Sequence, residues 1–212
     1  MTITTTQPRV EKAPRTIPPK GPGQERHLAK ERKRLWDKPA GAIVRLHDYR
    51  VRITDGPNAY MQYKDVFVRG IYRFTSDRPS PLVIDGGSNM GVSILGFKHF
   101  CPDAHIIGFE PDDALHAMTL ENLKRNGITD GVTLVKSGLA AEAGTASFAP
   151  DGSAGGQVGG EAENLTTIRV EKLSDYLGEE VDFLKLNIEG QEFPVLRSPR
   201  RRGGRGIPAL RC

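Results

Sequence analysis

Residues 82–93, LVIDGGSNMGVS, are the clearest indication of the fold in this chain. Its apolar beginning predicts a short buried strand, and the apolar residues 90–100 that follow predict a deeply buried helix. Between them, Gly86 and Gly87 allow a tight turn and let a ligand approach the backbone closely. A strand, a glycine-rich turn and a helix in this order form the first unit of an α/β sheet.

The same alternation continues along the chain. We expect strands at 82–84, 105–109, 132–135 and 181–186, edge strands at 146–148 and 167–170, and helices at 90–100, 112–126 and 171–177. Strands that alternate with helices imply a parallel sheet with right-handed crossovers.

A cover for the sheet is expected upstream of it. Residues 50–54 alternate as a strand does and stop at Asp55-Gly56, which is a turn signal. Residues 60–74 carry aromatic and valine side chains at nearly helical spacing, so they predict a helix that packs across the domain and helps to cover the substrate cleft. Its tyrosines, Tyr60, Tyr63 and Tyr72, are expected to serve the core.

The basic residues are concentrated at the two ends of the chain. The net charge of the 212 residues is +4, but residues 1–34 carry +6 and residues 197–212 carry +6, which leaves −8 for the body between them. A domain that binds nucleic acid more often has a basic face on its folded part, so nucleic acid is not the expected partner. An RNA-binding role of the Arg- and Gly-rich tail is an alternative.

Composition also bears on the compartment. No apolar run reaches the ~18 residues of a membrane span, and the amino terminus lacks the apolar stretch of a secretory signal. Two cysteines, Cys101 and Cys212, cannot build a disulfide framework or a closed zinc site. We therefore expect a cytoplasmic protein. We expect no metal either, because no His, Asp and Glu residues occur at ligand spacing.

Polar and small residues stand where the predicted strands end, which is where open α/β sheets bind ligands. Asp85 could meet a ligand ammonium, and Glu110 at the next strand end could accept both hydroxyl hydrogens of an adenosine ribose. Small residues around Ser137 would leave room for an adenine ring. Because Ser88 replaces the second glycine of G-x-G-x-x-G, the turn is not that of a dinucleotide pyrophosphate site.

Five motifs together resemble the FkbM-type methyltransferase family, from about Tyr60 to Leu196. They are FVRGIYRF (67–74), VIDGGSNMGVS (83–93), IIGFEPD (106–112), AAEAGTASF (140–148) and DFLKLNIEGQEFPVL (182–196). The last is similar to the family pattern K-x-D-x-E-G-x-E, which is its most discriminating mark.

The resemblance implies a class I methyltransferase fold with a Rossmann-like sheet, S-adenosylmethionine as donor, and usually methylation of a hydroxyl oxygen. The acceptor would be a small molecule, a sugar or a lipid. The residues expected to hold the methionine end are Asp85, Gly86, Ser88, Asn89 and Gly91. Glu110 would hold the ribose, Ser137 would border the adenine, and Gly87 and Pro111 belong to the same cofactor site. Glu189 is the expected catalytic base, with Asn187 orienting donor or acceptor.

Two departures from the family pattern matter. Asn187 stands where the family usually has Asp, and an amide cannot act as a carboxylate base. After Leu196 the stretch RSPRRRGGRGIPALRC has no strand pattern and does not resemble the family. We therefore expect a sheet that lacks its last strands, with a tail produced by a frame shift or truncation.

The expected division of the chain is a disordered basic leader at 1–41, a strand and helix cover at 42–80, the S-adenosylmethionine-binding domain at 81–196 and the tail at 197–212. Two alternatives stay open for the function. One is a non-catalytic remnant of such an enzyme, and the other is an oxidoreductase that uses NAD(P).

Overall fold

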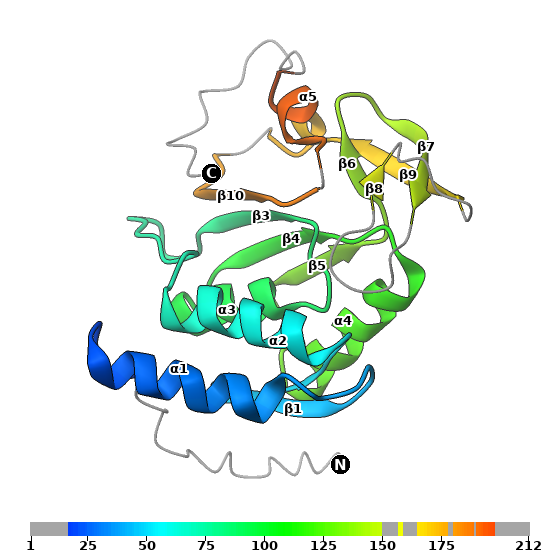
Figure 1. The fold of residues 1–212 in the computed structure, drawn as a ribbon. Helices are drawn as coiled ribbons and strands as arrows, with labels where there is room; N and C mark the ends of the chain where they lie inside the picture. The colour runs from blue at the N-terminus through cyan, green and yellow to red at the C-terminus, as the bar shows by residue number, and fades with distance from the viewer. Residues whose placement is uncertain (1–16, 150–156, 159–164, 178–179, 189, 198–212) are drawn as a thin grey trace, which may run out of the picture.

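The computed structural model describes residues 17–149, 157–158, 165–177, 180–188 and 190–197. At its centre is a parallel four-stranded sheet with the order β10-β3-β4-β5 (Figure 1). The strands are β3 (Leu82–Gly86), β4 (His105–Phe109), β5 (Val132–Val135) and β10 (Phe183–Leu186). This Rossmann-like α/β arrangement confirms the fold class and all four central strands predicted from the sequence.

Two helices follow the first two strands and pack on one face of the sheet. They are α3 (Val92–Phe100) and α4 (Asp113–Arg125). The side chain of Asp112 caps α4, because its Oδ1 accepts from the backbone N–H groups of Ala114 and Leu115, both at 2.9 Å. The helix ends before Gly127, whose φ of 68° suits a left-handed C-cap.

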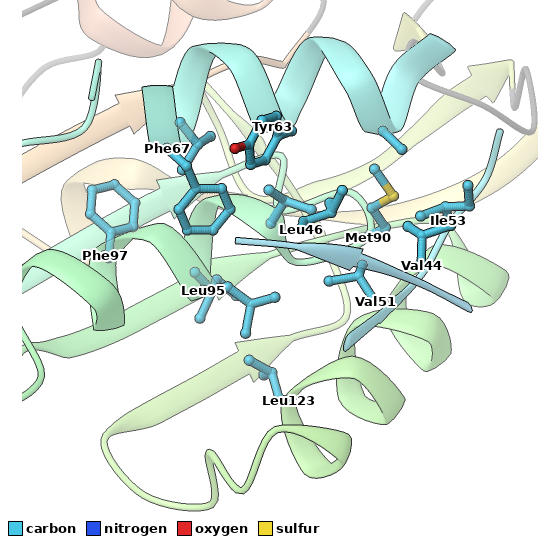
Figure 2. Packing of buried hydrophobic residues seen from close by; sticks show 14 of the residues in the cluster. Val44, Leu46, Val51, Ile53, Tyr63, Phe67, Met90, Leu95, Phe97 and Leu123 are labelled. Atoms are coloured by element: carbon cyan, nitrogen blue, oxygen red, sulfur yellow. The ribbon is translucent and has the colours of Figure 1, made fainter. Parts of the chain in front are cut away.

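Alternation along the strands divides the core between the two faces of the sheet. Val83 packs with α3 and the amino-terminal elements, in the cluster that Figure 2 shows around Phe67 and Leu95. Its neighbour Ile84 belongs to a second cluster on the opposite face, with Val195 of α5 (Glu192–Arg197). Both faces are covered, as a parallel sheet requires.

A second sheet lies beside the first, in the order β6-β9-β7-β8. Its strands are β6 (Gly138–Ala140), β7 (Gly144–Ala149), β8 (Gln157–Val158) and β9 (Thr166–Lys172). The two edge strands predicted from the sequence pair antiparallel with each other here, with Ala146 opposite Ile168. The predicted helix at 171–177 is wrong in extent: β9 continues to Lys172, and a single 3-10 turn, η2 (Leu173–Asp175), follows.

The amino-terminal layer contains a hairpin of β1 (Ile43–Leu46) and β2 (Tyr49–Arg52), of which the sequence indicated only the second strand. Two asparagines of α4 hold the outer edge of β2. Asn122 accepts from Arg52 N at 2.7 Å and donates to Arg52 O at 2.9 Å, and Asn126 bonds the N–H and C=O of Arg50 in the same way. The two amides thus take the place of a neighbouring strand.

Helix α1 (Pro22–Leu35) contradicts the prediction of a disordered leader for part of residues 1–41. Pro22 opens the helix, and basic residues in its last turn suit its dipole. Leu35 is fully buried, Leu28 packs against the same core, and the guanidinium of Arg34 donates to Arg45 O at 2.6 Å. The high charge of the segment hid these contact positions. Residues 1–16 lie outside the described part of the chain.

The predicted helix at 60–74 is wrong at both ends. α2 (Gly56–Gln62) begins after Asp55, which caps it by accepting from Asn58 N at 2.7 Å. It continues as a π-helix, η1 (Tyr63–Val68), and the helix ends before Gly70, whose φ is 64°. η1 lies close against α3, since a Cβ at Gly96 would stand 2.2 Å from a methyl of Val66.

No helix of the described residues is long and apolar enough to cross a bilayer.

The asparagine contacts between α4 and β2 provide a matched pair of variants. Asn122 is fully buried and also donates to Met90 O at 2.9 Å, whereas the bonds of Asn126 to Arg50 are exposed. Asn122→Ala should lower the free energy of unfolding by about 2–4 kcal/mol, because it leaves buried backbone groups unsatisfied. Asn126→Ala should cost about 1 kcal/mol or less, because water replaces its bonds. Equal losses in urea titrations would show that the buried amide has no special weight.

Candidate functional site

The glycine-rich turn after β3 is wound by residues with left-handed backbone. The φ angles are 78° at Gly87, 51° at Asn89 and 85° at Gly91. A Cβ at Gly87 would lie 2.1 Å from the carbonyl oxygen of Asn187, so only glycine lets the turn approach the end of β10. The turn therefore brings two distant parts of the sequence together at the carboxyl edge of the sheet.

The backbone N–H groups of this turn bond within the protein. Gly87 N and Ser88 N donate to Phe109 O at 3.0 and 2.9 Å, and Gly91 N donates to Ser88 O at 2.8 Å. A dinucleotide site needs such groups free to bind a pyrophosphate. The hydrogen bonds of this turn therefore count against the oxidoreductase alternative.

A buried ion pair supports the glycine-rich turn after β3. Asp85 is fully buried and lies opposite Lys185 in the register of β3 and β10, with 2.9 Å between Oδ1 and Nζ. The other carboxylate oxygen accepts from Ser93 Oγ at 2.6 Å. Burial lowers the pKa of Lys185, but Asp85, Tyr72 and Glu110 together raise it overall, so the ammonium stays charged.

Lys185 also fixes the backbone of the turn, because its Nζ donates to Gly86 O at 3.0 Å and to Gly87 O. This lysine was not among the site residues predicted from the sequence. A charge inside the apolar strand FLKL was the signal that could have found it. Asp85 was expected at the methionine end of a cofactor, but its contacts in the structure are with Lys185 and Ser93.

Glu110, at the end of β4, is the second buried carboxylate of the region. Its Oε2 accepts from Asn89 N at 2.7 Å and its Oε1 from Asp112 N at 3.0 Å. Burial raises the pKa of this carboxyl to about 7, although the two N–H donors lower it in part. Because its pKa lies near neutrality, this carboxyl can change its charge when a hydroxyl group donates a hydrogen bond to it.

A cavity of about 780 Å³ opens at the carboxyl ends of β3 and β10. Its floor includes three residues of the turn, Gly87, Ser88 and Asn89, together with Asn187. The lining does not include the other residues that were predicted to bind the cofactor, namely Asp85, Gly86, Gly91, Glu110, Pro111 and Ser137. Glu110 is nevertheless linked to the cavity, because it accepts a hydrogen bond from the backbone of Asn89, which lines the cavity.

The cover of the cavity comes from α2 and η1, as the sequence analysis expected of this segment. Gln62 Nε2 donates to Asn89 Oδ1 and to Asn58 Oδ1, both at 3.0 Å, and so ties the cover to the turn. Tyr60 and Tyr63 are buried in the core, but Tyr72 also lines the cavity. Burial raises the pKa of the Tyr72 hydroxyl, so this group stays protonated and can donate.

Of the two expected catalytic residues, Asn187 lines the cavity and is exposed, and Glu189 lies outside the described residues. Glu192 also lines the cavity, although it was not among the site residues predicted from the sequence. The carboxylate of Glu192 accepts from Ile188 N and Gly190 N, both at 2.9 Å. Glu192 therefore holds the backbone of Ile188 and Gly190.

The predicted adenine side lies at the end of β5. Ser137 is buried, and within the described residues its Oγ has no hydrogen-bond partner. Pro111 stands close by, since a Cβ at Gly138 would lie 3.9 Å from its ring. A buried hydroxyl of this kind calls for a polar ligand atom or a water molecule.

The sequence model described as "Methyltransferase FkbM domain" matches residues 87–211. The chain belongs to this methyltransferase family. The match covers more than half of the chain and confirms the resemblance that the motifs indicated. It runs to residue 211, and so takes in most of the tail that was expected to lie outside the family.

Two curated relatives of this FkbM domain are fungal methyltransferases. Methyltransferase sdnD of Sordaria araneosa is 25% identical over 172 residues, which are 64% of this chain and 66% of the relative. Methyltransferase 1 of Beauveria bassiana is 25% identical over 162 residues, which are 64% and 65% of the two chains. The chain thus spans just under two thirds of the length of these relatives.

Among solved structures, the FkbM domain is similar to the SAH-bound methyltransferase PaMTH1 of Podospora anserina, at a TM-score of 0.31 and 18% identity over 51% of this chain and 40% of that one. It is also similar to a putative rRNA methylase of Clostridium thermocellum, at a TM-score of 0.26 and 25% identity over 27% and 33%. Likenesses of this size carry no weight for the site.

The ion pair beneath the turn can be tested by removing one partner. Lys185→Met leaves the Asp85 charge buried without its counterion and should lower the free energy of unfolding by about 3–5 kcal/mol. The double variant Asp85→Asn with Lys185→Met should recover part of this loss. Lys172→Met, which removes the partner of the exposed Glu142, should cost less than about 1 kcal/mol. Similar losses for both lysines in denaturant titrations would refute the argument.

Proposed function

We propose that this FkbM domain transfers the methyl group of S-adenosylmethionine to a hydroxyl oxygen of a small molecule, sugar or lipid. The observation that carries the proposal is the position of Glu110. Its buried carboxyl stands at the tip of β4, against the glycine-rich turn at the tip of β3. This is where a carboxylate can accept the two hydroxyl hydrogens of an adenosine ribose.

The residues around Glu110 fit the other parts of such a donor. Gly87 lets the turn lie against Asn187 at the end of β10, and both residues line the cavity, so a donor bound there would lie close to the backbone of the turn. Ser137, with its buried Oγ, can serve the adenine side. The turn offers no free row of N–H groups for a pyrophosphate, which agrees with a donor that has none.

The bound donor supplies an electrophilic methyl group on a sulfonium. The protein then has to hold the acceptor oxygen in line with this carbon, at about 3 Å. Asn187 and Gln62 present amide groups at the cavity and can orient the acceptor through hydrogen bonds. Glu189 remains the proposed base for the hydroxyl proton, since the two described carboxylates of the lining, Asp65 and Glu192, are engaged with Arg69 and with backbone N–H groups.

The cavity favours an acceptor with an apolar body. Its rim carries the exposed apolar side chains Met61, Ile71 and Phe193. Lys185 is the only cation among the described lining residues, and its charge is already paired with Asp85. A phosphate-rich acceptor such as nucleic acid would find no free positive charge in this lining.

A cytoplasmic location belongs to the same proposal. It is supported by the low number of cysteines and by Cys101, which is a free thiol. A remnant that binds the donor without transferring its methyl group would share these features. The amide of Asn187, in place of the usual carboxylate, is the residue that favours this second candidate.

Binding of S-adenosylhomocysteine, compared with binding of NAD+, distinguishes a methyltransferase from an oxidoreductase. S-adenosylhomocysteine should raise the melting temperature of the full chain, because a ligand that binds only the folded state stabilises it. NAD+ at the same concentration should leave the melting temperature unchanged. A shift with NAD+ alone, or a folded protein with no shift from S-adenosylhomocysteine, would contradict the proposal.

The affinity for S-adenosylhomocysteine should depend on pH through Glu110. In the free protein this carboxyl has a pKa of about 7, so it is mostly protonated at pH 6 and mostly ionised at pH 8. If ribose hydroxyls donate to the ionised form, the dissociation constant should fall roughly tenfold from pH 6 to pH 8. Glu110→Gln should bind more weakly and show no such dependence, whereas Glu121→Gln at the far end of α4 should behave as the unaltered chain. Calorimetry that finds the same pH profile in Glu110→Gln would remove Glu110 from the donor site.

A further inference from the structure

Three potential ligands gather away from the cavity, around the turn of the amino-terminal hairpin. They are His47, Asp48 and His99, and one ligand atom of each lies within 4.8 Å of the others. Among the described residues this is the one group of three or more His, Cys, Asp or Glu side chains with such geometry. Asp48 and His99 are 51 positions apart in the chain, which explains why spacing in the sequence gave no sign of a metal site.

The hairpin turn has a histidine where such turns favour other residues, and the side chain of His47 lies in the interior. The last pair of the hairpin is Leu46 with Tyr49, so His47 and Asp48 form a two-residue loop. Such loops favour Asn or Gly where φ is positive, yet His47 has a φ of 51°. Its side chain is only 4% exposed and stacks on Phe67, with 5.4 Å between ring centroids. Strained residues of this kind persist where the structure uses their side chains.

His99 meets this turn from the last turn of α3. The rings of His47 and His99 lie edge to face, with 4.4 Å between their centroids. Asp48 Oδ2 lies 2.9 Å from Nδ1 of His47. The carboxyl end of a helix favours a positive charge, so α3 itself attracts a cation to this point.

The surroundings suit an ion that is partly shielded from water. The rings of Tyr49, Phe67 and Phe100 lie against His99. Asp48 keeps 31% of its side chain exposed, which leaves a path for an ion. The charged groups that face His99 are Asp48, which favours a cation, and Arg73, which opposes it.

We propose that His47, Asp48 and His99 bind a divalent transition-metal ion of the zinc class. Two imidazoles and one carboxylate suit Zn²⁺, Co²⁺ or Ni²⁺, whereas Mg²⁺ and Ca²⁺ prefer oxygen ligands alone. Metal–ligand bonds of about 2.0–2.2 Å would place the three ligand atoms roughly 3.3 Å from one another. Asp48 and His99 are only partly buried, so their side chains can rotate toward the buried His47.

Such an ion would clamp the β1–β2 hairpin to the carboxyl end of α3. The amino-terminal end of the same helix follows the glycine-rich turn, and Asn122 joins β2 to Met90 O of that turn. The metal would therefore stabilise the layer that supports the turn. The three ligands are not among the lining residues of the cavity, so this site does not depend on the proposed methyl transfer.

The experiment uses the full chain after treatment with a chelator. Calorimetry with Zn²⁺ should show one tight equivalent, and Co²⁺ should give the intense visible bands of a four-coordinate ion. At a free Zn²⁺ concentration of 100 times the dissociation constant, the melting temperature should rise by roughly 5–10 °C. Mg²⁺ at the same concentration should leave it unchanged.

Three variants decide whether the ion sits at this cluster. His99→Ala and Asp48→Asn, which alter partly exposed side chains, should each weaken Zn²⁺ binding at least tenfold. His105→Ala, at an exposed position of β4, should bind as the unaltered chain does. If both cluster variants bind Zn²⁺ normally, or if the chain binds none, the site does not exist. Binding of S-adenosylhomocysteine by the same variants keeps this outcome separate from the proposed function.

Discussion

The ion pair between Asp85 and Lys185 is the constraint on which the carboxyl edge of the sheet depends. Two charges buried at the centre of a domain are costly unless geometry and further hydrogen bonds compensate for their lost hydration. Here the parallel register sets them opposite each other at 2.9 Å, and Ser93 and the carbonyls of Gly86 and Gly87 satisfy their remaining atoms. One pair thereby joins two strands, the glycine-rich turn and the start of α3.

The shape of the site follows from this arrangement. Because Lys185 holds the turn through its carbonyl groups, the N–H groups face β4 and bond to Phe109 and Glu110. Glu110 is drawn into the same network and loses contact with water, which is why its pKa rises to about 7. The carboxyl edge of the sheet thus presents backbone N–H groups that are already hydrogen-bonded, and one carboxyl whose charge depends on pH. It does not present a row of free N–H groups.

The amino-terminal elements complete the domain from the other side. Within the described part of the chain no strand lies beside β2, and the side-chain amides of Asn122 and Asn126 satisfy that edge instead. α1 packs on α2 so closely that a Cβ at Gly56 would lie 2.1 Å from Leu35 O. η1 in turn packs on α3, and Figure 2 shows Phe67 within this packing. The cover of the cavity is therefore part of the core, which gives Gln62 a fixed position above the turn.

The sequence alone predicted the parallel sheet, its strand positions and the family, because apolar periodicity and glycine-rich turns are local signals. It also placed Glu110 and Asn187 at strand ends, since a strand end can be read from the residues beside it. Three features became visible only in the folded chain: Asp85 faces Lys185, α1 is a helix, and His47 meets His99. Each of these depends on residues far apart in the chain. Their contacts arise from strand register and helix packing, which no local pattern encodes.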